Sequence, residues 1–471
     1  MSYSVIVKED CATCQLVVPV IKQLKEDDEL TIYSQDNVQF PSGVSVIDDT
    51  QLEYSWRRRI ETVPTLIKFN DNGEELARVI GWEKSEWQAL TGKPLEFDLP
   101  DFRPGCGSKS VDPGMPEKLA ARFDRDKLQS RELTISTEED DMEACFDRGW
   151  SDGLPVVPPT AERVMRMLTG TNRSPDEIVG VVPPDLALCT IEKIAINAVL
   201  AGCKPEYLPV VIASVEAALQ DEFCMHGLLA TTYYSGPLVI VNGPLSRAIG
   251  MNSKGNALGQ GNRANATIGR ALQLVIRNIG GGKPGGVDRS VFGNPGKYTY
   301  CFAEDETNSC WESLAVEKGF SETASTVTLF AADGMQGIVD QKSRDPESLS
   351  RSFAAALRVV GHPKMILASD VILVVSPEHE RVYRLAGWTK QDVKNCLNKL
   401  LTIDGSELVA GAGGIAEGIP EKLGGKQLPK FREGGLNIVR AGGSAGMFSA
   451  IIAGWGASGT IGSVPVTREI K

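Results

Sequence analysis

Hydrophobic positions in the first part of the chain recur with two different spacings. A β-branched run at residues 4–10 predicts a strand, and apolar side chains at helical spacing predict a helix over residues 15–25. The apolar segments 65–69 and 75–82 flank Asn-Asp-Asn-Gly, a sequence typical of a hairpin turn. A helix is predicted from about residue 84 to residue 90. This mixture of strands and helices predicts an α/β fold.

The chain beyond residue 117 also alternates between helical and strand patterns. Two apolar helices are predicted on either side of a break, with Gly202 closing the first helix and Pro205 opening the second. A buried strand is predicted over residues 237–244, followed by a long Gly/Asn-rich loop and another helix. Because strands and helices continue to alternate to the C-terminus, we expect a large α/β domain with two lobes.

The segment between these two parts has no hydrophobic periodicity. It is rich in Pro, Gly and Ser, which is typical of a linker. The predicted organisation is therefore an N-terminal domain, a linker and two α/β lobes, at residues 1–95, 96–116, 117–320 and 321–471.

Composition narrows the classes of partner. The chain of 471 residues has a net charge of −12 and no long basic run, which disfavours nucleic acid or an anionic membrane as a partner. No segment approaches the roughly 20 apolar residues needed to span a bilayer, and the N-terminus lacks a secretory signal pattern. We expect a cytoplasmic protein that acts on a small molecule, with no nucleic-acid and no membrane partner.

The strongest chemical signal is a pair of cysteines near the N-terminus. The ten cysteines of the chain are too sparse for a disulfide scaffold, so most should be free thiols. Cys11 and Cys14 are two residues apart, between the first predicted strand and the first predicted helix. The amides and the dipole of a helix N-terminus favour a thiolate, so we expect a redox-active dithiol.

The dithiol after the first strand, the Thr-Val-Pro-Thr sequence before the hairpin and a Gly after the following strand together resemble the thioredoxin family over residues 1–95. The resemblance implies that Cys11 is the attacking thiol, Cys14 the resolving thiol and Pro64 a cis-proline that faces them. Two positions depart from the family pattern: Ala-Thr lies between the cysteines, and Val5 stands where the family has a buried acid.

Other cysteines are candidate partners for this dithiol. Cys189 precedes a predicted helix, where a thiolate is favoured. Cys224 and His226 are two residues apart and would share one face of a strand, as nucleophile and base or as part of a metal site. Both thiols could instead be structural. The full set of candidate target thiols is Cys106, Cys189, Cys203, Cys224 and Cys301, of which Cys189 and Cys224 are preferred.

A Gly-x-Gly-x-x-Ala pattern opens the helix that follows the Gly/Asn-rich loop. Such loops can hold an anion with backbone amides and a basic side chain, although these glycines could also serve packing alone. The candidate substrate-binding residues for a carboxylate or another small anion are Asn252, Gly259, Gly261, Arg263, Asn265 and Arg270.

Residues 117–471 resemble bacterial proteins with an NGP…NRANATIGRAL…NPGKYT core, some of which carry a thioredoxin-like module; this resemblance implies no reaction. Our first hypothesis is a thiol-dependent oxidoreductase or lyase that acts on a small anionic substrate, with the N-terminal domain re-reducing a cysteine of the large domain. One alternative is an enzyme that handles a soft metal through thiolates. Another is a non-catalytic protein with a docking domain. We expect a homo-oligomer, and a metal cofactor stays an open possibility.

Overall fold

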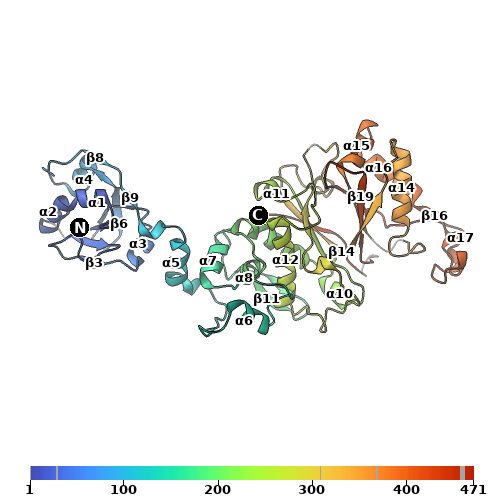
Figure 1. The fold of residues 1–471 in the computed structure, drawn as a ribbon, viewed down its shortest axis with the longest axis horizontal. Helices are drawn as coiled ribbons and strands as arrows, with labels where there is room; N and C mark the ends of the chain where they lie inside the picture. The colour runs from blue at the N-terminus through green and yellow to red at the C-terminus, as the bar shows by residue number, and fades with distance from the viewer. Residues whose placement is uncertain (1, 28–29, 308, 367–369, 457–461) are drawn as a thin grey trace. The chain divides into compact units, whose positions relative to one another are not determined.

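The protein is described from a computed structural model, which covers residues 2–27, 30–307, 309–366, 370–456 and 462–471. The chain divides into two compact units, a smaller unit at Met1–Lys127 and a larger unit at Leu128–Lys471. Figure 1 shows sheets and helices in both units, so the predicted α/β class is confirmed.

The smaller unit is built on a five-stranded sheet in the order β3-β2-β1-β5-β6 within the described residues. Strand β1 runs parallel to β2 and antiparallel to β5, and its residues Val5, Ile6 and Val7 are fully buried. The strands are β1 (Ser2–Val7), β2 (Leu30–Ser34), β3 (Ile47–Asp48), β4 (Thr62–Val63), β5 (Thr65–Phe69), β6 (Glu75–Ile80), β7 (Trp82–Glu83), β8 (Phe102–Arg103) and β9 (Cys106–Gly107). The helices are α1 (Ala12–Leu16), α2 (Val18–Asp27), α3 (Glu53–Arg57), α4 (Lys84–Thr91) and α5 (Met115–Phe123).

The linker predicted at residues 96–116 is wrong, because this segment packs as part of the smaller unit. Strand β8 pairs with β7, and β9 pairs with β4. Ser108 and Ser110 are buried, and the Gln35 side-chain amide donates to Ser108 Oγ at 2.6 Å. The Pro and Gly residues therefore shape tight backbone contacts, and the boundary between the units lies at residues 127 and 128.

The larger unit is built on one sheet of seven strands among the described residues, in the order β13-β12-β14-β19-β15-β18, with β20 paired to β14. Two further pairs, β10 with β11 and β16 with β17, form separate two-stranded sheets. The strands of the larger unit are β10 (Ile178–Val182), β11 (Ala187–Thr190), β12 (Gly236–Asn242), β13 (Cys301–Ala303), β14 (Thr326–Val339), β15 (Val371–Val375), β16 (Thr402–Asp404), β17 (Gln427–Pro429), β18 (Leu436–Arg440), β19 (Phe448–Gly454) and β20 (Val466–Glu469). This sheet takes strands from both sides of residue 320, so the predicted division into lobes at 320/321 does not separate two sheets.

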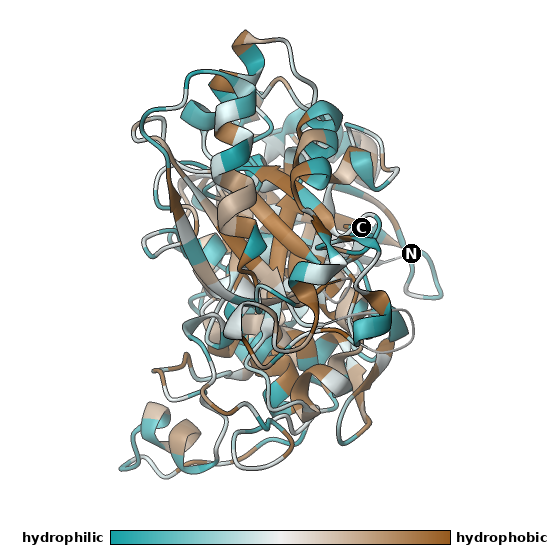
Figure 2. Cartoon of the chain, turned by 90° about the vertical axis from the view of Figure 1, so that its right-hand side faces the viewer, coloured by the Kyte–Doolittle hydropathy of each residue, from teal (hydrophilic) through white to brown (hydrophobic). Residues whose placement is uncertain are grey.

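Helices pack on the faces of this sheet. Residues alternate along β12: Val239 and Val241 pack with helices α8, α9 and α12, while Leu238 and Ile240 face the opposite side. Figure 2 shows the hydrophobic central strands between helices of mixed polarity. The helices are α6 (Asp141–Asp147), α7 (Ala161–Leu168), α8 (Ile191–Ala201), α9 (Leu208–Ala218), α10 (Met225–Ala230), α11 (Pro244–Ala248), α12 (Arg263–Asn278), α13 (Leu314–Glu317), α14 (Pro346–Arg358), α15 (Pro377–Leu385), α16 (Lys390–Leu400) and α17 (Gly405–Leu408).

Several local predictions for the larger unit are confirmed. Gly202 ends α8 with a φ of 85°, in the left-handed region that favours glycine, and a short 3-10 turn beginning at Pro205 leads into α9. All residues of β12 are buried, as expected for the predicted strand over residues 237–244. None of the helices in the described part of the chain is long and apolar enough to cross a membrane.

Candidate functional site

The two cysteines of the dithiol lie at the start of α1. Cys11 is the N-cap residue, and the backbone N–H of Cys14 donates to Cys11 Sγ at 3.2 Å. Cys11 is 2% exposed and Cys14 is fully buried. The prediction of a dithiol at a helix N-terminus is therefore confirmed, and a backbone donor points at the first sulfur.

Strand β4 lies beside this dithiol. Cys11 Sγ lies 3.5 Å from the carbonyl oxygen of Val63, to which it donates only when it is protonated. The peptide bond between Val63 and Pro64 is cis, as we expected for Pro64. Residues about 50 positions apart along the sequence thus come together at one sulfur atom.

A third thiol completes the cluster. In the antiparallel pair of β4 and β9, Cys106 is the direct partner of Val63, the same residue that accepts from Cys11. The Cys106 thiol is close enough to lower the pKa of Cys11. On the other side of Cys11, Thr13 Oγ1 donates to the Pro104 carbonyl at 2.7 Å. Residues 104–107, which we name the strap, therefore lie beside the start of α1 and strand β4.

These contacts separate the pKa values of the three thiols. The S–H donors of Cys14 and Cys106 and the N–H donors of Cys14 and Thr13 outweigh burial and lower the pKa of Cys11 to about 5. Burial raises the pKa of Cys14 far above its usual range, and the hydrogen bond it donates to Cys11 adds to this. The pKa of Cys106 is also raised, mainly by burial. Cys11 is therefore the thiolate of the cluster at neutral pH.

The expectation of a thiolate at Cys189 is wrong. Cys189 lies in β11 and is fully buried in the main core of the larger unit, which raises its pKa to about 12. Thr190 is the N-cap of α8, and its side chain accepts from the N–H of Lys193. The free amide at the start of α8 thus bonds to the Thr190 hydroxyl, while the Cys189 thiol packs in the apolar core.

Two further target thiols of the larger unit are also buried. Cys203 donates to the Thr267 carbonyl at 3.4 Å, and burial raises its pKa to about 12. Burial likewise raises the pKa of Cys301. Both act as core residues, because a neutral thiol is a small apolar side chain.

Cys224 and His226 do not share a face, because the segment is helical and not a strand. Cys224 has a φ of 53° and immediately precedes α10, while His226 lies exposed in the first turn of that helix. Two residues of helix rotate the side chain by about 200°, so the pair is turned apart. Of the two preferred target thiols, Cys189 is buried and Cys224 is half-buried.

The predicted anion loop is held by contacts within the chain. The buried Asn265 side chain accepts from the N–H of Asn252 at 3.0 Å and donates to the Asn252 and Ala257 carbonyls. The Asn252 side chain in turn bonds to the backbone of Lys254 and Gly255. These amides therefore fix the loop conformation, and their hydrogen-bonding atoms are already used.

The basic residues of the predicted anion site are engaged as well. Arg263 donates to the Gly202 carbonyl at 3.0 Å, at the end of α8. Arg270 pairs with both carboxylate oxygens of Asp152, at 2.7 and 2.9 Å. Gly261 has a φ of 109°, and a Cβ at Gly259 would lie 2.2 Å from an Asn256 oxygen, so both glycines are explained by the loop itself.

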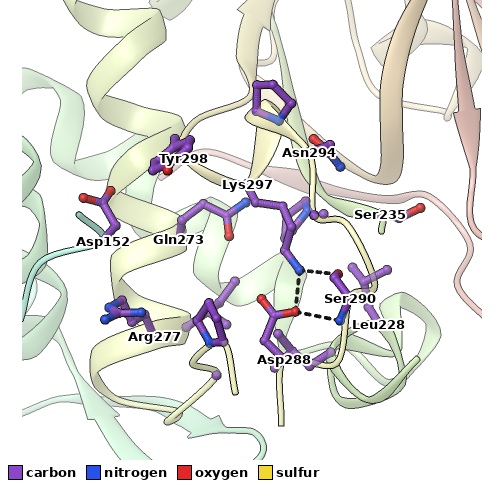
Figure 3. A pocket seen from close by; sticks show the side chains of 18 of the residues that line it. Asp152, Leu228, Ser235, Gln273, Arg277, Asp288, Ser290, Asn294, Lys297 and Tyr298 are labelled. Carbon is purple, nitrogen blue, oxygen red and sulfur yellow. Dashed lines mark hydrogen bonds and ion pairs between the residues drawn. The ribbon is translucent and has the colours of Figure 1, made fainter. Parts of the chain in front are cut away.

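A cavity of about 490 Å³, with both polar and apolar lining residues, opens beside the C-terminal part of α12 (Figure 3). Gln273 and Arg277 project into it from one face of that helix, and Asp288, Ser290 and Lys297 line it from the loop that follows. Lys297 Nζ lies 2.6 Å from Asp288 Oδ1 and donates to Ser290 Oγ at 2.8 Å. The volume is in the range of small-molecule pockets.

Several polar atoms on the cavity wall have no hydrogen-bond partner within the described residues. They are Gln273 Nε2, Arg277 Nε, Ser235 Oγ and Asn294 Oδ1. Ser235 is 1% exposed, so its hydroxyl cannot be satisfied by bulk water. No sequence pattern predicted these residues as a site, and the local signal that could have pointed to them is the glycine run Gly280–Gly282, just after α12.

The described residues contain no cluster of three or more His, Cys, Asp or Glu side chains that could hold a metal ion. Neither the comparison with protein-family models nor the search of curated proteins finds a match to this chain. The thiol cluster and the cavity are therefore the two candidate sites of the molecule.

Proposed function

We propose that the smaller unit is a thioredoxin-like domain that performs thiol–disulfide exchange through Cys11. The observation that carries the proposal is the set of donors around the Cys11 sulfur, which favours a thiolate in a partly shielded site. The thiolate is the nucleophile in disulfide exchange. The sheet order, the dithiol at the start of α1 and the cis peptide before Pro64 support the thioredoxin-like assignment.

In this reaction the Cys11 thiolate attacks one sulfur of a substrate disulfide. A mixed disulfide forms on Cys11, and the other half of the substrate leaves as a thiolate that takes a proton from water. A second protein thiol then attacks the Cys11 sulfur and releases the bound half. Two electrons pass from two protein thiols to the substrate disulfide. Cys14 and Cys106 both act on the pKa of Cys11 and are the candidates for the second thiol.

The proposal is tested with dithiobis(nitrobenzoate) at pH 6, on the full chain. A thiol of ordinary pKa is almost fully protonated there, whereas Cys11 is mostly ionised. Its lower intrinsic nucleophilicity offsets part of this gain, so we expect a phase about tenfold faster than an ordinary thiol. Cys11→Ser should remove that phase, and Cys310→Ser, which removes an exposed thiol of the larger unit, should retain it. An unchanged fast phase in Cys11→Ser contradicts the proposal.

We further propose that the larger unit binds a small anionic substrate in the cavity at Arg277. Asp152 and Asp288 are paired with Arg270 and Lys297, which leaves Arg277 as the cation of the wall without an acidic partner in the described residues. A guanidinium is suited to bidentate recognition of a carboxylate or phosphate. Gln273, which projects into the cavity from the same helix, would bond to a hydroxyl or carbonyl group of the same molecule.

Calorimetry with succinate, citrate and glycerol phosphate tests this second proposal. Loss of a charge-assisted hydrogen bond is worth about 1.5–3 kcal/mol, so Arg277→Gln should weaken binding about 10- to 150-fold. Arg263→Gln is the matched control, because Arg263 lies on the same helix but contacts only the chain. Binding that is lost in Arg263→Gln and kept in Arg277→Gln, or binding by none of the three anions, rejects this site.

The first hypothesis also gave the dithiol a target thiol in the larger unit. We retain this as a proposal with Cys224, because burial raises the pKa of Cys189, Cys203 and Cys301 and so disfavours their thiolates. A disulfide between Cys11 and Cys224 in mildly oxidised Cys14→Ser protein would support it. Oxidised protein in which Cys224 stays fully alkylatable would reject it.

A further inference from the structure

We propose that Cys106, and not Cys14, is the thiol that resolves the mixed disulfide on Cys11. This inference rests on the proposed exchange reaction and reassigns one of its steps. The resemblance to thioredoxins implies the resolving role for Cys14, so the two assignments make opposite predictions for the same pair of variants.

The backbone places Cys106 independently of its sulfur chemistry. Antiparallel pairing of β9 with β4 sets Cys106 opposite Val63, whose carbonyl is 3.5 Å from Cys11 Sγ. Cys11 and Cys106 therefore both lie at Val63, and each thiol shifts the pKa of the other. Because the fold brings Cys106 to the residue that Cys11 contacts, its attack on Cys11 is an intramolecular step that needs little rearrangement.

The strap is anchored at both ends. Before it, Thr13 Oγ1 holds the Pro104 carbonyl at 2.7 Å. After it, the N–H of Ser108 donates to the Glu61 carbonyl at 2.9 Å, and the buried Ser110 hydroxyl donates to the Ile60 carbonyl. A Cβ at Gly105 would lie only 2.4 Å from Thr62 Cγ2. The close approach of the strap to β4 is therefore built into the sequence.

Cys14 is placed to hold the Cys11 thiolate and is poorly placed to attack a disulfide. Its N–H donates to Cys11 Sγ at 3.2 Å, its thiol helps to lower the pKa of Cys11, and its side chain is fully buried. Burial of a thiol in apolar surroundings opposes the thiolate that the attack requires. Burial raises the pKa of Cys106 too, but this residue is half-buried whereas Cys14 is fully buried, so deprotonation of Cys106 meets the smaller penalty.

The step conserves atoms and electrons. Cys106 loses its proton to water and attacks Cys11 Sγ, the bond between Cys11 and the substrate sulfur breaks, and the substrate leaves as a thiol after taking a proton. The product is a Cys11–Cys106 disulfide. A dithiol reductant then attacks the accessible Cys106 sulfur, and Cys11 leaves as a thiolate. Exchange is faster when the departing thiol has a low pKa, which suits Cys11 to that role.

Stepwise release of thionitrobenzoate tests the assignment on the full chain. One equivalent of dithiobis(nitrobenzoate) at pH 6 loads Cys11 and releases one thionitrobenzoate. The pH is then raised to 8.5 at low micromolar protein, and resolution releases the second. We expect the second release in wild type and in Cys14→Ser. In Cys106→Ser we expect a drop of at least tenfold in its rate and a trapped mixed disulfide on Cys11.

Peptide mapping without reduction identifies the disulfide that forms. A Cys11–Cys106 link in wild type and in Cys14→Ser supports the inference. A Cys11–Cys14 link in wild type, with release unimpaired in Cys106→Ser, overturns it and leaves the exchange reaction standing. Failure of the first release to depend on Cys11 would instead remove the proposed function. The Cys310→Ser variant, which leaves the cluster intact, should behave as wild type in both phases.

Discussion

At the scale of single residues, the Cys11 thiolate depends on a small set of donors. Two of them belong to Cys14, through its N–H and S–H, and one is the S–H of Cys106. Desolvation opposes the charge, so the position of these donors decides the sign of the pKa shift. The sequence placed Cys11 and Cys14 correctly, because the motif is local. It did not place Cys106 among the donors, since that contact depends on strand pairing.

The pH dependence of alkylation should report this environment. We expect the rate of Cys11 modification by iodoacetamide to rise with pH and level off with a midpoint near pH 5. Cys310, whose pKa is raised to about 12, should show no plateau below pH 9. Mass spectrometry of the two peptides across the pH range measures both. Equal midpoints for the two thiols would show that the donors do not act on Cys11.

Stability should depend on pH through the same thiol. The pKa of Cys11 is about 5 in the folded protein and about 8.5 in an unfolded chain, so ionisation favours folding. This contribution is complete above pH 8.5, decreases as the pH falls through the window between the two values, and is absent below pH 5. As the pH falls through this window, the free energy of unfolding of reduced wild type should decrease relative to that of Cys11→Ser, as measured by urea unfolding. If the free energies of the two proteins instead change in parallel with pH, the Cys11 thiolate does not stabilise the fold.

At the scale of elements, the strap is decided by two short strands and a glycine. Strands β4 and β9 contain two residues each, and neither has a hydrophobic pattern that predicts a strand. Gly105 lets the strap approach Thr62 and Val63. Composition alone made residues 96–116 appear to be a linker, because Pro and Gly are typical both of flexible segments and of close backbone contacts.

Substitution of the strap glycines should show whether this segment is a flexible linker or a closely packed strap. Gly105→Ala places a Cβ 2.8 Å from the Val63 oxygen, so we expect a loss of about 1–3 kcal/mol in unfolding free energy and a weaker Cys11–Cys106 contact. Gly107→Ala is the control, because a Cβ there meets no atom within 4 Å. Denaturant unfolding and the yield of the Cys11–Cys106 disulfide measure the two effects. A similar loss in both variants would show that strap packing is not the cause.

At the scale of the whole molecule, each unit has its own hydrophobic core. The core of the smaller unit contains residues from Tyr3 to Leu95, with the half-buried Cys106 packed against it. The cores of the larger unit draw on residues from Cys145 onward. Separate cores are typical of regions that fold independently.

Two fragments of the smaller unit should therefore behave differently. Residues 1–127 should fold and give the same alkylation midpoint for Cys11 as the full chain. Residues 1–95 lack the Pro100 carbonyl that accepts from Trp82, the Ser108 partner of Gln35, and the Cys106 donor. We expect this shorter fragment to be less stable and its Cys11 midpoint to be higher. Circular dichroism measures the stability of the two fragments, and alkylation measures their Cys11 midpoints. Equal stability and equal midpoints would support the prediction that residues 96–116 are a linker.

The sequence by itself determined the features that depend on neighbouring residues. These include the dithiol at a helix start, the end of α8 at Gly202 and the buried strand β12. Helix spacing, caps and alternation are set within a few residues, so a local pattern is sufficient to predict them.

The tertiary structure alone decided which polar groups are free. Arg270 forms an ion pair with Asp152, which is 118 positions earlier in the sequence. Arg277, seven residues farther along the same helix, faces a cavity instead. In the same way, β9 brings Cys106 to Cys11, and the core seals Cys189. A side chain's reactivity depends on its partners and its burial, and packing between distant segments fixes both.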